Sequence, residues 1–198
     1  MTEPHDWEAI YAAEAPPPWD IGRPQPAFVR LAEAGLLRGR FLDPGCRTGE
    51  HTLLAAAHGA DALGVDVSAN AIDKARHKAA ERGLAARFEV GDALALETFV
   101  LTVDTVLDSG LFHVFDDADR ARYVESLAAV LAPGGRAYIM CFSDRQPGDW
   151  GPRRVRREEL EGAFADGWGI VDIVAESFEI GMAGLATAQS WLATIDRL

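Results

Sequence analysis

The sequence has little cysteine, a deficit of basic residues and no long apolar segment. Its two cysteines, Cys46 and Cys141, lie far apart without a CxxC partner, so we expect no disulfide framework and no metal site. The 19 basic residues are outnumbered by 31 acidic ones, and the net charge of −12 disfavours general binding to nucleic acid or anionic membranes. No run approaches the roughly 20 apolar residues of a membrane-spanning helix, and the first six residues lack the regions of a signal peptide.

These deficits favour a soluble, cytoplasmic protein with a small-molecule partner, acting as a monomer or a homodimer. With 198 residues and 48% apolar residues, the chain is long enough for one core, so we expect a single domain over residues 1–198. Five short apolar runs alternate with helical stretches, which indicates an α/β fold with a parallel sheet. The runs are 41–42, 62–65, 87–90, 103–107 and 137–142.

Helix signals separate these runs. Ser68 is a good cap for a helix that Gly83 would end, and apolar residues at helical spacing predict another helix over 117–131, before Pro133 and two glycines. Shorter helices are expected over 51–58 and 158–165. Two consecutive strand-like runs, 170–180 and 188–195, predict an antiparallel hairpin at the sheet edge.

The first 38 residues differ in kind, because a small apolar face around Trp7 and Tyr11 precedes the proline-rich stretch 16–22. This segment is interpreted as an N-terminal arm with a helix. Two alternatives stay open: a lid over a binding site, or a loosely packed terminal arm.

Polar residues follow three successive strands. The glycine-containing turn Asp43 to Glu50 leads from a strand toward a helix, and such a turn allows backbone N–H groups to approach a ligand. Asp66 ends the next strand, where a carboxylate can accept both hydroxyls of a ribose, and Asp92 ends the third strand-like run, so the three carboxylates meet at the ligand-binding edge of the sheet. The dinucleotide fingerprint GxGxxG fails, because Arg47 stands at its second glycine position and Glu50 at its third. A nucleotide-dependent oxidoreductase is therefore disfavoured.

The ordered series resembles class I S-adenosylmethionine (SAM)-dependent methyltransferases. Asp43, Gly45, Arg47 and Gly49 resemble motif I, an acidic residue followed by GxGxG, and the segment 131–136 resembles the loop before the fifth strand of that family. The resemblance implies a doubly wound, Rossmann-like sheet of seven mostly parallel strands with an antiparallel last strand, and SAM as cofactor with S-adenosylhomocysteine (SAH) as product. It implies that Asp66 holds the ribose and that Asp92 with Ala93 contacts the adenine amino group. The full set of cofactor-binding positions that it implies is Trp19, Asp43, Gly45, Cys46, Arg47, Thr48, Gly49, Asp66, Val67, Asp92, Ala93 and Asp108.

The segments 17–26 and 108–113 look like a bacterial subgroup of small-molecule methyltransferases related to the thiopurine type. In that subgroup the arm closes over cofactor and acceptor, which the resemblance implies for Trp19 and Ile21. It also places Asp108 beside the methionine part of the cofactor, where the carboxylate would face the ammonium group. A capping or surface aspartate is the alternative.

Arg47 departs from the family pattern. An arginine costs about 1 kcal/mol or more if its φ must be positive, and its guanidinium would compete for cofactor space. We expect the side chain to point to solvent and to leave cofactor affinity reduced. The alternative is a catalytically silent protein of the same fold, with a binding or regulatory role and a cofactor site blocked by Arg47.

Methyl transfer requires alignment, proximity and a dry pocket rather than a metal. His113 is the candidate general base, with a positioning role as the alternative. We expect methylation of oxygen, sulfur or nitrogen on a small, aromatic or heteroaromatic acceptor; a nucleic-acid or protein methyltransferase is disfavoured by the net charge and by the lack of an Asn/Asp-Pro-Pro-Tyr clamp. The candidate acceptor-binding residues are Trp19, Phe112, His113 and Trp150.

Overall fold

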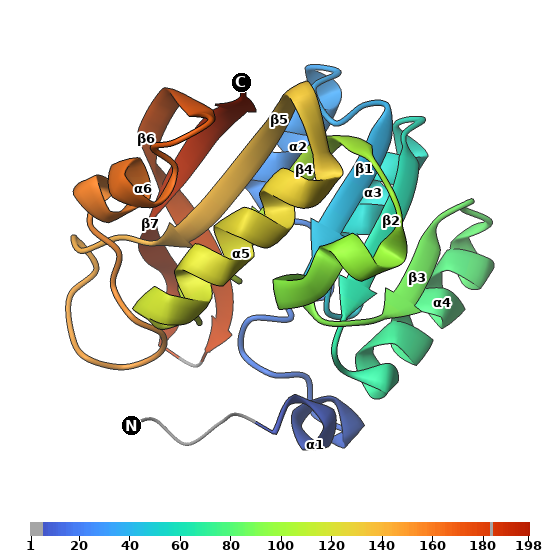
Figure 1. The fold of residues 1–198 in the computed structure, drawn as a ribbon. Coiled ribbons are helices and arrows are strands. Elements are labelled where there is room, and N and C mark those ends of the chain that lie inside the picture. Colours follow the sequence, from blue (N-terminus) through green and yellow to red (C-terminus); the bar gives the residue numbers. More distant parts are fainter. Residues whose placement is uncertain (1–5, 183) are drawn as a thin grey trace.

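A computed structural model describes residues 6–182 and 184–198, so residues 1–5 of the expected arm lie outside the described residues. Seven strands form one sheet in the order β3-β2-β1-β4-β5-β7-β6, and β7 runs antiparallel to both of its neighbours (Figure 1). This confirms the predicted sheet, its antiparallel last strand and the terminal hairpin. The strands are β1 Arg40–Pro44, β2 Asp61–Asp66, β3 Arg87–Val90, β4 Val103–Ser109, β5 Leu131–Phe142, β6 Trp168–Met182 and β7 Leu185–Arg197.

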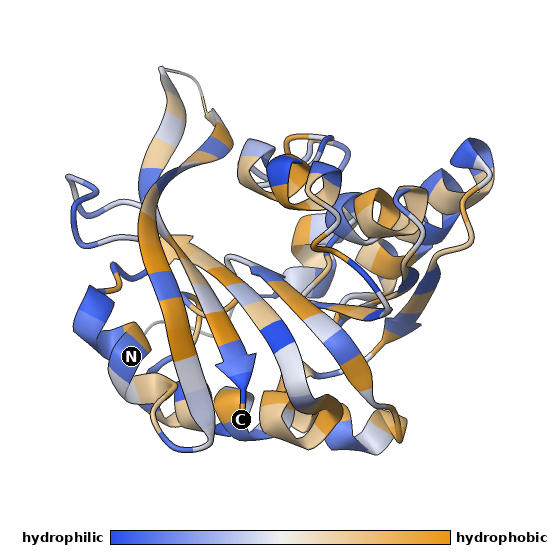
Figure 2. Cartoon of the chain, turned by 90° about the horizontal axis from the view of Figure 1, so that it is seen from above, coloured by the Kyte–Doolittle hydropathy of each residue, from blue (hydrophilic) through white to orange (hydrophobic). Residues whose placement is uncertain are grey.

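Helices cover both faces of the sheet, as in a doubly wound fold. One core cluster joins Leu42 and Val106 to apolar residues of α5 and α6, and a second joins Phe41 and Leu107 to residues of α2 and α3. Neighbouring residues of β1 and β4 thus alternate between the two cores. Figure 2 shows apolar residues, in orange, distributed along the strands. The helices are α1 Trp7–Ala12, α2 Pro26–Glu33, α3 Glu50–Ala57, α4 Ala69–Arg82, the 3₁₀ segment η1 Ala93–Phe99, α5 Asp117–Val130 and α6 Arg157–Ala163.

Local signals end the helices where the sequence predicts. The Ser68 hydroxyl accepts the backbone N–H of Ala71 at the start of α4, and Gly83 ends that helix with a φ of 62°. Asp116 caps α5 in the same way by accepting the N–H of Asp119. Both long helices are therefore confirmed within one or two residues.

The start of β5 differs from the expectation. We expected Pro133 and the following glycines to lie before the strand, but β5 already begins at Leu131. The register between β4 and β5 moves from the pair Val103 and Leu131 to the pair Thr105 and Arg136, so the glycine-rich residues form an irregularity inside the strand. Tertiary pairing with β4 overrides the local breaker signal.

The carboxyl ends of the parallel strands meet at one edge, and α1 lies directly below the ends of β1 and β2 in the view of Figure 1. The arm therefore reaches the edge at which folds of this kind bind ligands. Among the described residues, no helix has the length and apolarity needed to cross a membrane.

Gly49 packs against Ala75 and Phe88 of a third apolar cluster, formed by residues of α3, α4 and β3, and its substitution should destabilise the fold. Its φ is 87°, and a Cβ there would lie 2.7 Å from Phe88 Cε1 and 2.8 Å from Ala75 Cβ. We expect Gly49→Ala to lower the free energy of unfolding by about 2 to 4 kcal/mol, because overpacking adds to the backbone strain.

Gly59→Ala is the matched control for urea denaturation. Gly59 has a φ of 89° but nothing within 4 Å of a built Cβ, so only the backbone cost of about 1 kcal/mol remains. Equal loss of stability in both variants would show that close packing at Gly49 contributes nothing.

Candidate cofactor and acceptor site at the carboxyl edge

The loop after β1 takes a left-handed backbone at alternate positions. Gly45, Arg47 and Gly49 have φ values of 68°, 55° and 87°. The middle position therefore demands the conformation that glycine adopts freely, and Arg47 adopts it at a cost of about 1 kcal/mol. The side chain of Cys46 is buried in the core below, while its backbone N–H donates to the carbonyl of Val65. The loop is thus fastened to β2.

Asp66 organises this loop from the end of β2. One carboxylate oxygen accepts the N–H of Arg47 at 2.9 Å, and the other accepts the N–H of Ser68 at 3.0 Å. Only 7% of Asp66 is exposed, and burial raises the pKa of its carboxyl group against the opposing effect of these hydrogen bonds. Each oxygen retains a second lone pair, as binding of a ribose hydroxyl requires.

Two further carboxylates are buried at the same edge. Asp43 accepts the hydroxyl of Thr52 at 2.8 Å, and burial raises its pKa to about 7. Asp108 has no exposed surface and accepts three hydrogen bonds, from the N–H groups of Leu111 and Phe112 and from the Tyr123 hydroxyl. This is the geometry of the capping alternative for Asp108. A contact with a ligand ammonium group stays a prediction.

His113 lies in the turn after β4, and its ring nitrogen Nδ1 accepts the N–H of Phe142 at 2.9 Å. The proton of the neutral ring therefore resides on Nε2, which is a donor. Burial, together with the charge of Arg47, lowers the pKa of His113 to about 3. Both observations oppose the general-base role and favour the positioning alternative.

The described part of the arm is packed against the site. Tyr11 is only 3% exposed, its hydroxyl accepts the indole N–H of Trp19, and Trp7 packs edge-on against Trp19. Glu8 accepts hydrogen bonds from Ser68 and from Asn70 at the start of α4. This part is therefore not a loosely packed terminal arm, whereas its opening as a lid stays a prediction.

Further contacts hold the arm at both of its sides. Thr48 donates its hydroxyl to Asp20 at 2.7 Å and accepts from Lys78. On the opposite side, the N–H of Gly181 in β6 donates to the carbonyl of Pro18 at 2.6 Å. A groove of about 1030 Å³ lies between the arm, α4 and the β6–β7 tip, and it reaches Thr48. The groove is large enough for a small molecule.

Arg47 lies between the arm and the sheet. Its Nη1 donates to the carbonyl of Trp19 at 3.1 Å, and its Nη2 would lie 3.3 Å from a Cβ built on Gly110. The same built Cβ would lie 3.0 Å from Nε2 of His113. The expectation that Arg47 points to solvent is therefore wrong, because the arm offers it a carbonyl acceptor.

The predicted acceptor residues are divided between core and surface. Phe112 is fully buried against Phe164, so it belongs to the core and offers no surface to an acceptor. Trp150 is half-buried and packs edge-on against Phe142, which in turn packs against His113. The rings of Trp150, Phe142 and His113 thus form a continuous series.

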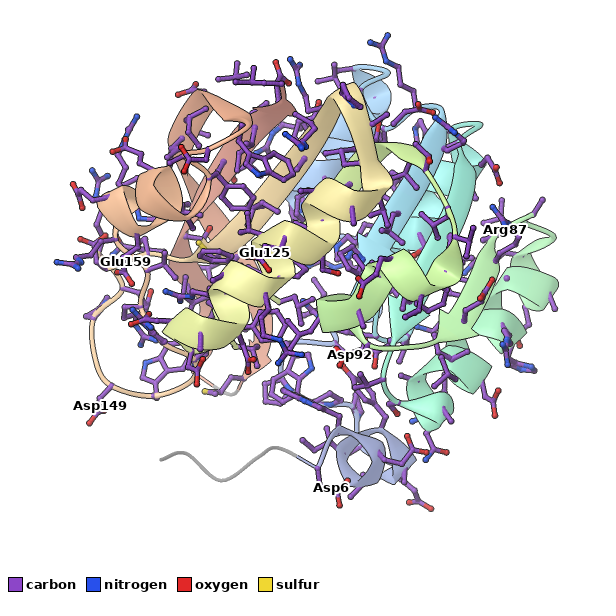
Figure 3. All side chains as sticks on the ribbon, in the orientation of Figure 1. Asp6, Arg87, Asp92, Glu125, Asp149 and Glu159 are labelled. Carbon is purple, nitrogen blue, oxygen red and sulfur yellow. The ribbon has the colours of Figure 1, made fainter. Side chains whose placement is uncertain are left out.

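The remaining predicted positions follow β3 (Asp92 and Ala93) and β2 (Val67). Asp92 caps η1 by accepting the N–H of Leu94, and it lies between the sheet and α1 in the view of Figure 3. Ala93 is buried, whereas Val67 is 50% exposed. Contacts of these three residues with an adenine stay predictions.

Sequence reasoning missed the residues that fasten the arm and the loop after β5. Glu8 carries no motif, Asp20 lies within the segment 17–26 whose resemblance does not indicate this contact, and Arg154 stands among several arginines. Arg154 donates to the carbonyls of Gln146, Gly148 and Trp150 and lies over the Trp150 ring. Nothing in the sequence distinguishes Glu8 and Asp20 from the other acidic residues of the arm, such as Asp6 and Glu14.

Residues 41–135 match the family model described as a methyltransferase domain. The chain is 35% identical over 176 residues to the 2-heptyl-1-hydroxyquinolin-4(1H)-one methyltransferase of Mycobacteroides abscessus, covering 84% of this chain and 78% of that protein. It is 28% identical over 181 residues to a probable thiol methyltransferase of Arabidopsis thaliana, covering 88% and 78%.

Two solved structures have a fold similar to that of this chain. A protein studied for the conversion of a disulfide bond into a thioacetal group during echinomycin biosynthesis has a TM-score of 0.87 and 37% identity, covering 96% of this chain and 91% of that one. A SAM-dependent methyltransferase from Anabaena variabilis has a TM-score of 0.79 at 19% identity, covering 97% and 93%, and shares the fold.

The neutral, buried state of His113 predicts a pH effect on stability. The pKa of His113 is about 3 in the folded protein and near 6.5 in the unfolded chain. The protein therefore loses stability as the pH falls below 6.5, because the unfolded chain then binds a proton that the folded protein does not. Between pH 7 and pH 5 this group should lower the free energy of unfolding by about 2 kcal/mol.

We expect His113→Asn to remove that part of the pH dependence in urea denaturation series, because the Asn carbonyl preserves the acceptor for Phe142. Identical pH slopes in the native protein and the variant would contradict a neutral, buried His113.

Proposed function

The chain belongs to the SAM-dependent methyltransferases, and from that premise we propose that it methylates sulfur, oxygen or nitrogen of a small aromatic or heteroaromatic molecule at the carboxyl edge of its sheet. The observation that carries the location is Asp66, which is buried beneath the arm and fixes a left-handed loop by a backbone hydrogen bond. Such a loop brings backbone and carboxylate groups within reach of one ligand.

The relatives support the acceptor class. One is described as acting on a 1-hydroxyquinolin-4-one, and another as a probable thiol methyltransferase. The solved relative is described by a reaction at a disulfide bond. These descriptions name either sulfur or a hydroxylated heteroaromatic ring, and we propose the same two kinds of acceptor for this chain.

The cofactor fits the residues at the adenosine end of the site. Asp66 would accept the ribose hydroxyls, and Asp92 with Ala93 would lie beside the adenine, as the family resemblance implies. The positive φ of Gly45 and Gly49 turns the loop at positions where a Cβ would press against Leu111 and Phe88, respectively. At the opposite end, the guanidinium of Arg47 stands between Trp19 and Gly110.

When bound, SAM would supply a methyl group attached to a sulfonium, and the neutral thioether that remains is an excellent leaving group. The residues of this chain then need to exclude water and align the acceptor. The packed arm supplies the cover, and the rings of Phe142 and Trp150 supply an apolar wall. The Nε2–H group of His113 would donate a hydrogen bond to an acceptor heteroatom that has already lost its proton, and would thereby orient it.

Binding of the product cofactor should depend on Asp66. At a hundredfold excess over its dissociation constant, SAH should stabilise the native protein by about 2.7 kcal/mol, which corresponds to a melting temperature about 5 to 11 °C higher. We expect Asp66→Asn to abolish this shift under the same conditions, because the amide loses an acceptor for the ribose.

Asp61→Asn is the control, since Asp61 lies at the opposite, exposed end of β2. Methyl transfer is followed by mass spectrometry with high SAM and a panel of thiols, phenols and N-hydroxyquinolones. No shift with SAH and no methylated product would refute the proposed function.

Trp150 should affect the acceptor and not the cofactor. We expect Trp150→Leu to raise the KM of an aromatic acceptor roughly fivefold, the loss of about one aromatic contact, with the KM of SAM unchanged. An aliphatic thiol provides the internal control. Equal effects on the KM values of aromatic and aliphatic acceptors would argue against an aromatic wall.

A further inference from the structure

We propose that Arg47 is an internal counter-ion that occupies the methionine end of the cofactor site and makes the site discriminate against positively charged ligands. The inference rests on the proposed function, because it assumes that SAM and SAH bind at this edge. It assigns Arg47 as the residue that determines the preference between the two ligands, which differ by the charge on sulfur.

The position of the guanidinium is the first observation. The backbone N–H of Arg47 is bound to Asp66, and its side chain extends from there to the Trp19 carbonyl and to the neighbourhood of Gly110. Asp66 ends β2, Gly110 follows β4, and Trp19 belongs to the arm. The side chain therefore lies between the sheet edge and the arm that covers it, in the space that a ligand at this edge needs.

The charges around the guanidinium are the second observation. Asp43, Asp66 and Asp108 are buried at this edge, and burial raises the pKa of each carboxyl group, while the positive charge of Arg47 opposes that rise in all three. Buried carboxylates require a compensating cation or hydrogen bonds. Arg47 is therefore the cation at the centre of the site, in the role that a positively charged ligand would otherwise fill.

The backbone is the third observation. Arg47 holds a left-handed conformation that costs a residue with a Cβ more than it costs glycine. The hydrogen bond to Trp19 and the surrounding carboxylates compensate for that strain only while the guanidinium stays in the site. Removal of the side chain therefore does not threaten the loop, because glycine adopts the same backbone without strain.

Two consequences follow for a ligand. Any ligand that extends along this edge must displace the guanidinium from the Trp19 carbonyl. A ligand with a positive sulfonium meets a like charge that an otherwise identical thioether does not, and like charges a few ångströms apart repel strongly in a partly buried site. The native site should bind SAH better than SAM, and Arg47 should be the cause.

The test compares dissociation constants of SAM and SAH by isothermal titration calorimetry for the native protein and three variants. Arg47→Met keeps the length of the side chain and removes its charge, and Arg47→Gly removes both. Arg23→Met removes an arginine of the arm itself, outside the loop that holds Arg47, and this arginine pairs with Glu179 at the surface. It controls for loosening of the arm and for the change in net charge.

We expect Arg47→Met to shift the ratio of the two dissociation constants toward SAM by roughly tenfold, the effect of removing a nearby like charge. Arg47→Gly should in addition tighten the binding of both ligands, because the space is freed. Arg23→Met should leave the ratio as it is in the native protein.

Two results would overturn the proposal and leave the proposed function intact. One is that the ratio of the SAM and SAH dissociation constants in Arg47→Met equals the native ratio, while the native protein binds both ligands as tightly as Arg47→Gly does. Neither the charge nor the volume of Arg47 would then affect binding. The other is equal weakening of both ligands in Arg47→Met, which would mean that Arg47 pairs with the carboxylate that SAM and SAH share. Absence of binding in every protein, Arg47→Gly included, would instead refute the proposed function itself.

Discussion

Burial of three carboxylates at one edge of the sheet is the constraint on which the site depends. Parallel strands bring their carboxyl ends together, so Asp43, Asp66 and Asp108 are held close to one another with little access to water. A desolvated carboxylate requires hydrogen-bond donors or a cation. The turn after β4 and the left-handed loop after β1 supply backbone N–H groups, and Arg47 supplies the charge.

The sequence predicts the parts of this arrangement that depend on neighbours in the chain. Ser68 and Gly83 delimit α4 because capping and left-handed termination are local events, and the alternation of strands and helices places Asp66 at a strand end. Arg47 stands at the middle glycine of the family pattern, so the cost of a positive φ there was open to prediction, and the observed φ is 55°. The terminal hairpin was predicted from two consecutive strand-like runs, whereas the seven-stranded sheet followed from the family resemblance.

The parts that the sequence does not predict depend on partners far along the chain. The direction of the Arg47 side chain is set by the carbonyl of Trp19, 28 residues away, and the tautomer of His113 by the N–H of Phe142, 29 residues away. The position of Phe112 in the core likewise depends on Phe164. No local pattern reports such contacts, so the predicted direction of the Arg47 side chain was wrong, and the general-base role of His113 stays a prediction that its buried ring and low pKa oppose.

The contact between Pro18 and Gly181 joins the first and the last parts of the chain. During synthesis Pro18 leaves the ribosome well before Gly181, the residue whose N–H its carbonyl accepts. Gln25 repeats this arrangement through its hydrogen bonds with the backbone of Glu179. The arm can therefore take its place only after the β6–β7 hairpin has been made, and until then a nascent chain presents an uncovered, acidic strand edge.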